Sequence, residues 1–493
     1  MPYLLALDQG TTSCRTIVVD RSGKIVASDQ LEFTQYFPKA GWVEHDAEEI
    51  FDIQMKTLKG ALDKAGITAS DVQAIGITNQ RETTLVWDKE TGKPIHHAIV
   101  WQDRRTSDFC EELKSIGYEE TIRTKTGLPI DAYFSASKLH WLLNYVEGAH
   151  EKAEAGNLLF GTMDTWLIWK MTRGQSHVTD HTNASRTMLF DIAASEWDET
   201  LLSLFAVPRS MMPAVKSSSE HFGIFKMDGV EIPISGVAGD QQAALFGQGC
   251  VEKGDVKNTY GTGCFVLMNQ GNEMTSSDFG LVTTRACSLD SKPVYALEGS
   301  VFIGGAAVQW LRDGINIIDH AAETQEMAEQ AQGEDELVLV PAFVGLGTPY
   351  WDMYARGAVF GLTRDTGREH FAKAALQAIA FQTRDVLDAM EKDSGLKVET
   401  LKVDGGATAN DYLMQFQADL LDTPIAVSEH TETTALGAAY LAGLQVGFWN
   451  LEEVKRFSNS GRHFSPKMEE SKRERLYSQW KKAVSRTLGW LKD

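Results

Sequence analysis

"LLALDQGTTSCRTIVVD" (residues 4–20) consists of two apolar stretches joined by a polar turn. A two-residue hairpin turn needs only a pair such as Asn-Gly. This turn carries instead a carboxylate (Asp8), a glycine and three hydroxyl side chains, and Arg15 follows it closely. These groups form either a hydroxyl-rich turn or half of a phosphate-binding clamp, and other stretches of the chain distinguish the two interpretations.

Length and composition indicate a soluble protein with more than one domain. A chain of 493 residues is too long for one ordinary core, and 43% hydrophobic with 23% charged residues is typical of globular proteins. The net charge of -21 argues against nucleic acid or an anionic membrane surface as a partner. A phosphate ligand remains compatible with this charge, because metal ions and backbone N–H groups neutralise phosphate locally.

The cysteines and the apolar runs predict a cytoplasmic location. The five cysteines are scattered and form no Cys-x-x-Cys pair, which favours a reducing compartment without disulfides or a zinc site. No apolar run reaches 18 residues, and the N-terminal region lacks the basic start of a signal peptide. We therefore expect no stable membrane insertion.

Strand and helix patterns alternate along the chain and predict an α/β fold. Residues 45–66 place apolar side chains at helical spacing after Asp46, which lies three positions before Glu49 as in a capping box. Residues 369–395 predict a long amphipathic helix that ends near Gly395.

A partial internal repeat predicts two related domains. "DVKNTYGTGCFVLMNQG" (255–271) resembles residues 4–20, because each stretch has an entering strand, a Gly-Thr turn and an apolar exit strand. We expect an N-terminal domain at 1–249 and a C-terminal domain at 250–493, with a ligand cleft between them.

Four stretches share a chemistry suited to phosphate. Glycines allow close backbone approach, hydroxyls donate to phosphate oxygens, and carboxylates hold Mg²⁺. The common GxxxxGK[ST] and GxGxxG loops are absent from the chain. Any one stretch could be a plain turn, but the four together predict a nucleotide site. They are residues 8–13, 239–242, 261–263 and 404–407.

Further motifs resemble the FGGY family of carbohydrate kinases. "YFSASKLHWLLN" (133–144) and "GAVFGLTRDTGREHFAKAALQ" (357–377) are similar to its signatures. The resemblance implies two actin-like (ribonuclease-H-like) ATPase domains, ATP and Mg²⁺ as cofactors, and a homo-oligomer (dimer or tetramer). Four stretches look like the members that phosphorylate glycerol to sn-glycerol 3-phosphate: 79–88, 99–106, 238–248 and 258–269.

Arg81 and Glu82 follow an apolar strand, where open α/β sheets place ligands. A guanidinium donates to polyol oxygens and a carboxylate accepts from hydroxyls, although a surface ion pair would give the same sequence. The resemblance assigns both residues to glycerol binding. It also implies substrate contacts from Trp101, Tyr133, Gln241 and Phe265, although aromatic residues in such positions are equally typical of a core or its edge.

Asp240 and Asp8 are the candidate catalytic and metal-binding carboxylates. Asp240 follows a glycine turn that opens a helix, so it is either a helix cap or the group that accepts the proton of the attacking hydroxyl. The resemblance makes Asp240 the general base and a substrate contact. It also implies that Asp8 and Asp240 hold Mg²⁺, chiefly through water, although Asp8 alternatively braces its turn.

The resemblance also implies a set of nucleotide contacts in both domains. Those near the N-terminus face the β- and γ-phosphates, where Arg15 would offset developing charge. Asn410 is in addition a plausible helix N-cap, and both roles are compatible. The set comprises Thr11, Thr12, Ser13, Arg15, Thr262, Gly305, Gln309, Gly406 and Asn410.

Regulation is where the resemblance weakens. Enteric members of the family are inhibited by fructose 1,6-bisphosphate at a loop with a glycine and an arginine. This chain has Gly229 but carries Glu231 where the arginine would fall, so we expect weak or absent inhibition. His221 is the candidate nearby for regulatory phosphorylation, but a solvent-facing loop histidine is the better interpretation.

Two other functions remain as alternatives. A kinase of the same family acting on a ketopentose such as xylulose or on a sugar acid such as gluconate would need a substrate loop unlike Arg81-Glu82 and Trp101-Gln102. A non-enzymatic actin-like ATP-binding protein would need neither a polyol pocket nor a base such as Asp240.

Overall fold

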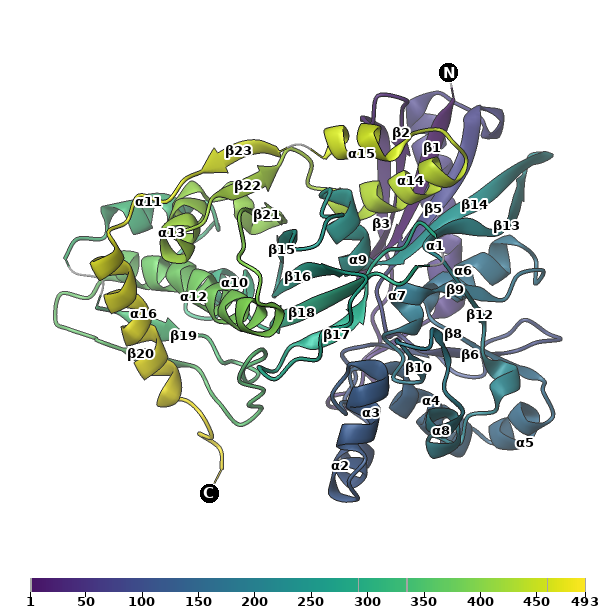
Figure 1. Ribbon diagram of the computed structural model, residues 1–493, viewed down its shortest axis with the longest axis horizontal. Coiled ribbons are helices and arrows are strands. Elements are labelled where there is room, and N and C mark those ends of the chain that lie inside the picture. Colours follow the sequence, from purple (N-terminus) through teal and green to yellow (C-terminus); the bar gives the residue numbers. More distant parts are fainter. Residues whose placement is uncertain (1, 291, 334–335, 459, 493) are drawn as a thin grey trace.

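Two mixed β-sheets organise the chain, each with helices packed against it (Figure 1). The computed structural model describes residues 2–290, 292–333, 336–458 and 460–492. Figure 1 shows the two sheets in neighbouring units: the first unit is built around the sheet that contains β1, and the second around the sheet that contains β15. The described N- and C-terminal parts of the chain lie on different units.

The first sheet has six strands in the order β13-β14-β5-β1-β2-β3. β1, β2 and β3 pair antiparallel in sequence, whereas β1 pairs parallel with β5, and β5 pairs parallel with β14. The strands are β1 (Tyr3–Gln9), β2 (Ser13–Val19), β3 (Ile25–Glu32), β5 (Val72–Asn79), β13 (Ser219–Met227) and β14 (Val230–Gly239).

The second sheet repeats this arrangement in the order β17-β18-β16-β15-β21-β22-β23. β15, β16 and β18 pair antiparallel as β1, β2 and β3 do, and β15, β21 and β22 pair parallel as β1, β5 and β14 do. The internal repeat predicted from the sequence is therefore confirmed. The strands are β15 (Val256–Tyr260), β16 (Cys264–Gly271), β17 (Val282–Arg285), β18 (Tyr295–Val301), β21 (Leu401–Asp404), β22 (Ile425–Ser428) and β23 (Ser460–Phe464).

The two long helices predicted from the sequence connect equivalent strands. α1 (Ala47–Ala65) lies between β3 and β5, and α12 (Arg368–Ser394) lies between β18 and β21. The Asp46 carboxylate accepts hydrogen bonds from the backbone N–H groups of residues 48 and 49, which confirms the N-cap. The Glu49 carboxylate, however, accepts hydrogen bonds from Thr34 instead of completing a capping box.

Two insertions add layers around the sheets. The longer one joins β5 to β13 and has its own apolar cluster, whose large members include Phe134, Phe160 and Phe190. Its helices are α2 (Ser107–Ser115), α3 (Glu119–Thr126), α4 (Ser135–Tyr145), α5 (Ala149–Glu154), α6 (Met163–Met171), α7 (His181–Ala184) and α8 (Glu199–Leu204). The shorter one joins β18 to α12 and contains α10 (Ala306–Asp313), α11 (Glu323–Gln330), β19 (Val338–Val340) and β20 (Ala358–Phe360).

The chain returns to the first sheet near its end. α14 (Thr433–Gln445) packs on β1, β5 and β14 and against α9 (Asp240–Gly247), and α15 (Leu451–Phe457) lies beside it (Figure 1). β23 then pairs with β22 in the second sheet, and α16 (Glu470–Ser485) follows. The proposed division at residue 250 therefore stays a prediction, and part of the later chain covers the first sheet.

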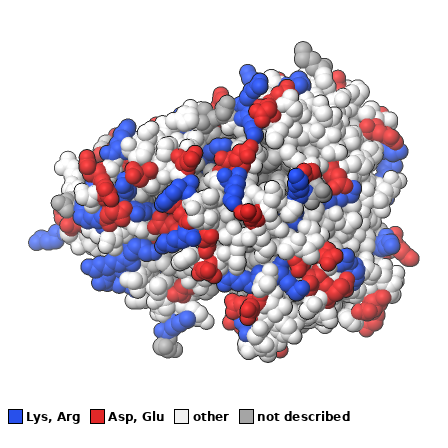
Figure 2. Space-filling view, in the orientation of Figure 1, with Lys and Arg blue, Asp and Glu red and all other residues white. Residues whose placement is uncertain are grey.

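Acidic and basic side chains are interspersed over the face seen in Figure 2, and neither sign forms one continuous field there. None of the described helices combines the length and the apolar content needed to cross a membrane.

Replacement of Gly437 by alanine is expected to weaken the contact between α14 and α9. A Cβ on Gly437 would lie 2.0 Å from the carbonyl oxygen of Ala243. We expect Gly437→Ala to lower the free energy of unfolding by about 1–3 kcal/mol, measured by urea denaturation, because overpacking outweighs the gain in helix propensity.

Gly461→Ala is the matched control, because its Cβ would meet Glu429 at an ordinary 3.5 Å on an exposed strand. It should change stability by less than about 0.5 kcal/mol. Equal urea midpoints for Gly437→Ala and the unaltered protein would contradict the prediction.

Candidate functional site

The carboxyl ends of three parallel strands bring the first group of predicted residues to one sheet edge. In the registers of these strands Gln9 lies opposite Asn79, and Asn79 lies opposite Gly239. The residues that follow each strand therefore emerge side by side at this edge, where open α/β sheets bind ligands. Gly10, Arg81 and Asp240 are among them.

Arg81 is the centre of a buried ionic network that spans both units. Its Nη1 and Nη2 donate to the two carboxylate oxygens of Glu298 at 2.6 and 3.1 Å, and its Nε lies 3.2 Å from Asp240 Oδ1. The side chains of Arg81 and Glu298 are 2% and 1% exposed, whereas that of Asp240 is 32% exposed. Asp240 is thus the member of this group that is open to a substrate.

Glu82 pairs with a second arginine that the sequence analysis missed. Arg186 Nε donates to Glu82 Oε1 at 2.6 Å, and Arg186 Nη2 donates to Glu298 Oε1 at 3.1 Å. Glu82 has a positive φ of 60°, and Ser135 Oγ donates to its carbonyl oxygen. The interpretation of Arg81 and Glu82 as an ordinary surface pair is wrong, because both side chains are buried.

The network contains two arginines and three carboxylates, and the arginine charges affect the pKa of each carboxylate. Burial raises the pKa of Asp240 and of Glu82, and the arginine charges oppose this. Although burial also acts against the charged form of Glu298, Arg186 and Arg81 lower its pKa to about 2. Glu298 is therefore a permanent anion, while Asp240 is the stronger proton acceptor.

The predicted aromatic residues lie at different distances from this network. Tyr133 lies with its ring 5.6 Å from the Arg186 guanidinium and 5.5 Å from the ring of Trp101. Trp101 Nε1 donates to Thr11 Oγ1 at 3.1 Å, so it connects this aromatic pair to the turn of residues 8–13. Phe265, on β16, packs against the apolar cluster around Leu245 and Leu267.

Asp8 and Asp240 are close enough to influence each other, and they fit a magnesium ion. Burial raises the pKa of Asp8 to about 6; Arg15 opposes this and the Asp240 charge adds to it. Among the described residues no three His, Cys, Asp or Glu side chains form a metal cluster. Mg²⁺ ordinarily needs only one or two carboxylates, with phosphate oxygens and water completing its shell.

The turn of residues 8–13, predicted to bind phosphate, is braced from neighbouring strands and from the later chain. The hydroxyl of Ser13 accepts from Gln30 Nε2 at 2.9 Å, and Arg15 Nε donates to Gln30 Oε1 at 3.1 Å. Arg15 also forms an ion pair with Glu432, directly before α14. Thr12 is exposed at the tip of the turn.

The second turn is fixed to the start of α10. Backbone N–H groups of Gly304 and Ala306 donate to the carbonyl oxygen of Thr262, and Gly305 N–H donates to that of Gly261. A Cβ on Gly305 would lie 2.8 Å from the Gly261 oxygen, so this approach requires glycine. Thr262 itself is exposed beside this contact.

The remaining predicted nucleotide residues lie on the second unit. Gln309 is exposed on α10, and Gly406 is exposed after β21. Asn410 Oδ1 accepts from Leu413 N–H, so its role as the N-cap of α13 (Asp411–Leu421) is confirmed, and its Nδ2 donates to Thr324 Oγ1 at 3.2 Å. Its predicted contact with adenosine stays a prediction.

Residues 3–247 match the N-terminal domain of the FGGY family of carbohydrate kinases, and residues 256–446 match the C-terminal domain. The chain belongs to this family. The predicted family and its two-domain α/β fold are thus confirmed.

Similar proteins and structures support the same assignment. The chain is 59% identical to a glycerol kinase of Caldanaerobacter subterraneus over 100% of its own length and 99% of that protein. It is 59% identical to glycerol kinase 2 of Thermotoga maritima over 100% of both. The crystal structure of Plasmodium falciparum glycerol kinase with ADP matches with a TM-score of 0.92 and 39% identity, covering 99% of this chain and 98% of that one.

A xylulose kinase structure from Lactobacillus acidophilus matches with a TM-score of 0.89 over 99% of this chain and 98% of that one, at 22% identity. This similarity shows the shared fold alone.

The loop discussed for regulation of this FGGY kinase is the turn between β13 and β14. Glu231 Oε1 lies 2.7 Å from Lys226 Nζ, and Gly229 has a φ of 81°. His221 is exposed, but it lies on β13, so its placement in a loop was wrong. Weak inhibition by a sugar bisphosphate stays a prediction.

Loss of the Glu298 charge is expected to destabilise this FGGY kinase. Glu298→Gln leaves Arg81 and Arg186 with fewer counter-charges in a buried setting, so we expect a loss of about 3 kcal/mol in the free energy of unfolding. Because the pKa of Glu298 falls from 4.5 to about 2 on folding, its contribution is fully present above pH 4.5 and is lost as the pH falls toward 2. Urea denaturation at pH 7 and pH 3 measures both effects.

Glu231→Gln is the matched control, because its pair with Lys226 is largely exposed. Its effect should lie between about 0 and 1 kcal/mol. Equal effects of the two substitutions at pH 7 would refute the buried network as a stabilising unit.

Proposed function

We propose that this chain transfers the γ-phosphoryl group of ATP to glycerol and forms sn-glycerol 3-phosphate. The observation that carries the proposal is the partly exposed Asp240 carboxylate, 3.2 Å from Arg81 Nε beside the buried Glu82. This arrangement combines a proton acceptor with a donor and an acceptor for neighbouring hydroxyls. Identity of 56–59% to several glycerol kinases supports glycerol as the acceptor.

The residues divide the reaction between them. Arg81 and Glu82 orient the glycerol hydroxyls, and the Tyr133 hydroxyl makes a further contact with glycerol. Trp101 and Phe265 cover its carbon chain. Asp240 accepts the proton of the attacking hydroxyl as its oxygen forms a bond to the γ-phosphorus. The bond from that phosphorus to the β–γ bridging oxygen breaks, and ADP keeps the electron pair.

The two glycine-containing turns hold the nucleotide. Thr11, Thr12 and Ser13 donate hydroxyl hydrogens to the β- and γ-phosphates, and Arg15 offsets the charge that develops there. Thr262, Gly305 and Gln309 contact the nucleotide from the second unit, and Gly406 with Asn410 contacts its adenosine end.

Asp8 and Asp240 would hold Mg²⁺, partly through water. At that position the ion would supply positive charge to offset that of the phosphates. Gln241 and Phe265 complete the polyol pocket when the two units approach each other. The same closure excludes water from the reacting phosphate. A cytoplasmic homo-oligomer remains part of this proposal.

Glycerol-dependent release of ADP is the first expected outcome. Purified protein with Mg-ATP should release ADP with glycerol, while xylulose and gluconate should give rates near that of water, because unpaired polar groups reject a mismatched ligand by about 10⁴-fold. A preference for xylulose or gluconate would keep the kinase assignment and change the substrate. ATP binding without transfer to any acceptor would favour an actin-like binding protein.

Asp240→Asn should lower kcat by about 10²–10⁴-fold, because the variant cannot accept a proton. Initial rates across glycerol and ATP concentrations separate this fall in kcat from any change in KM.

Asp164→Asn is a matched control on α6, where the carboxylate accepts from Thr162 and Thr179. Burial raises the pKa of Asp164 to about 7, so asparagine is close to its neutral form and kcat should be retained. Turnover of Asp240→Asn near that of the control would remove Asp240 as the base.

A further inference from the structure

Lys257 is a buried cation beside the site that the proposed reaction does not use. It lies on β15, at the start of the second sheet, and its side chain is fully buried. A buried ammonium is costly unless hydrogen-bond acceptors and carboxylates compensate for the lost water. Its neighbours therefore indicate why the chain retains a charge there.

The polar contacts of Lys257 reach into the polyol half of the site. Its Nζ donates to Gln241 Oε1 at 2.6 Å and to Thr259 Oγ1 at 2.9 Å. Gln241 directly follows Asp240 at the start of α9, so this bond fixes the side chain next to the candidate base from the other unit.

The electrostatic partners of Lys257 reach toward the nucleotide half. Burial lowers its pKa to about 8, and the charges of Asp404, Glu298 and Asp240 oppose that fall, while Arg81 adds to it. Of these carboxylates Asp404 has the largest effect, and Lys257 in turn opposes the rise that burial causes in the pKa of Asp404.

Asp404 begins the turn that carries Gly406. It lies opposite Thr259 in the parallel register of β15 and β21. Gly405 follows with a φ of 94°, and a Cβ there would lie 2.4 Å from the Tyr260 carbonyl oxygen. Thr433 at the start of α14 donates to Asp404 Oδ2, whereas Asp404 Oδ1 has no hydrogen-bond partner within the described part of the chain.

We propose that Lys257 is a positioning residue that couples the polyol half of the site, through Gln241, to the nucleotide half, through Asp404. The inference rests on the proposed function. The Lys257 ammonium donates to Gln241 in one direction and, in the other, to Thr259, which lies opposite Asp404 in the sheet, so a shift of either group changes the environment of the other. Nucleotide binding near Gly406 therefore strengthens glycerol binding near Gln241, and the reverse holds by linkage.

Lys257→Met keeps the length of the side chain and removes its charge. Calorimetry with and without a non-hydrolysable ATP analogue gives the factor by which the nucleotide tightens glycerol binding. We expect a factor of at least about 5 in the unaltered protein and close to 1 in Lys257→Met. The kcat of the variant should fall about 10- to 100-fold, because Gln241 and the neighbouring base lose their position.

Lys402→Met is the matched control on the adjacent strand. Lys402 lies opposite Lys257 in the sheet, and its Nζ donates to the carbonyl oxygens of Gln248 and Gly249. It should lose stability but retain kcat and the coupling factor. Lys257→Arg, which keeps the charge, should restore part of the coupling.

Thr259→Val provides a second test if Lys257→Met does not fold. It removes one acceptor of the ammonium and should reduce the coupling factor about threefold. A coupling factor within twofold of the unaltered protein in Lys257→Met, or in Thr259→Val where the former does not fold, would overturn the inference. The same conclusion follows if the unaltered protein shows no coupling, or if Lys402→Met shows an equal loss.

The proposed function can be refuted independently of this inference. If the unaltered protein releases no ADP in response to glycerol, the substrate assignment is wrong whatever the variants do. If it turns over glycerol and Lys257→Met keeps both kcat and coupling, the inference alone is wrong.

Discussion

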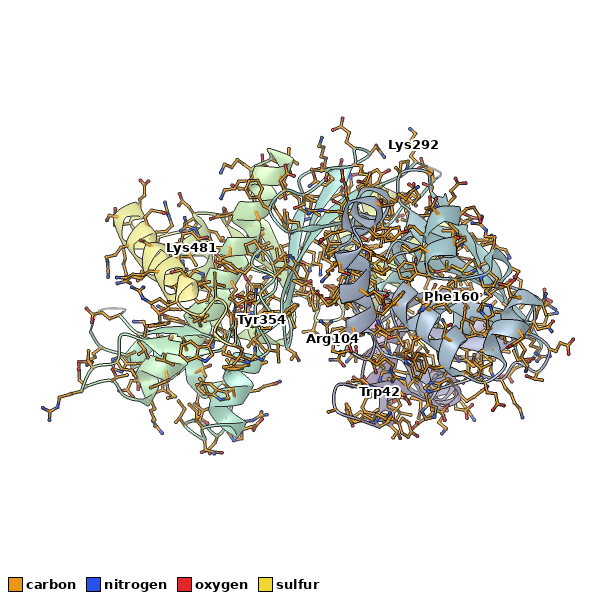
Figure 3. The ribbon with its side chains drawn as sticks, turned by 90° about the horizontal axis from the view of Figure 1, so that it is seen from below. Trp42, Arg104, Phe160, Lys292, Tyr354 and Lys481 are labelled. Carbon is orange, nitrogen blue, oxygen red and sulfur yellow. The ribbon has the colours of Figure 1, made fainter. Side chains whose placement is uncertain are left out.

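The bidentate ion pair between Arg81 and Glu298 is the interaction on which the site depends. It joins a loop of the first unit to a strand of the second, with both side chains almost wholly buried. Such a pair stabilises little in itself, but removing one partner leaves an uncompensated charge in a low-dielectric interior. The guanidinium that faces Asp240 is therefore fixed by a residue from the opposite unit, and both units contribute to the proposed polyol site. Figure 3 shows these units from below, with Arg104 on one and Tyr354 and Lys481 on the other.

The rest of the site follows from the repeated sheet. In each unit three antiparallel strands continue into parallel ones, so a tight turn and the ends of parallel strands meet at one edge. In the first unit this edge carries Asp8 and Asp240, and in the second it carries Thr262 and Gly406. Gly247 and Gly437 allow α9 and α14 to pack closely beside the edge of the first sheet.

Much of this fold could be predicted from local patterns, whereas the charge network could not. The repeated hairpins, the cap at Asp46 and the helix ending at Gly395 are encoded within short windows. Arg81 and Glu298 are 217 positions apart, so only the folded chain shows that they pair. A single acid inside the apolar strand of residues 294–303 was a usable signal for Glu298, and an arginine before an apolar stretch was a weaker one for Arg186. No sequence feature within α14 indicates that it packs on the first sheet, because the helix is apolar on most of its surface and shows no single packing face.

The return of α14 to the first sheet has a consequence for how the protein is made. Leu4, Ala6 and Ile17 belong to the same apolar cluster as Leu436, Leu441 and Trp449. On the ribosome, the earliest strands are therefore synthesised long before the helix that shields one of their faces emerges. That face of the sheet therefore stays exposed and prone to association while more than 400 further residues are synthesised. Chaperone binding to nascent chains would protect this face during synthesis, and truncation shortly before α14 would leave the same face without the helix that covers it.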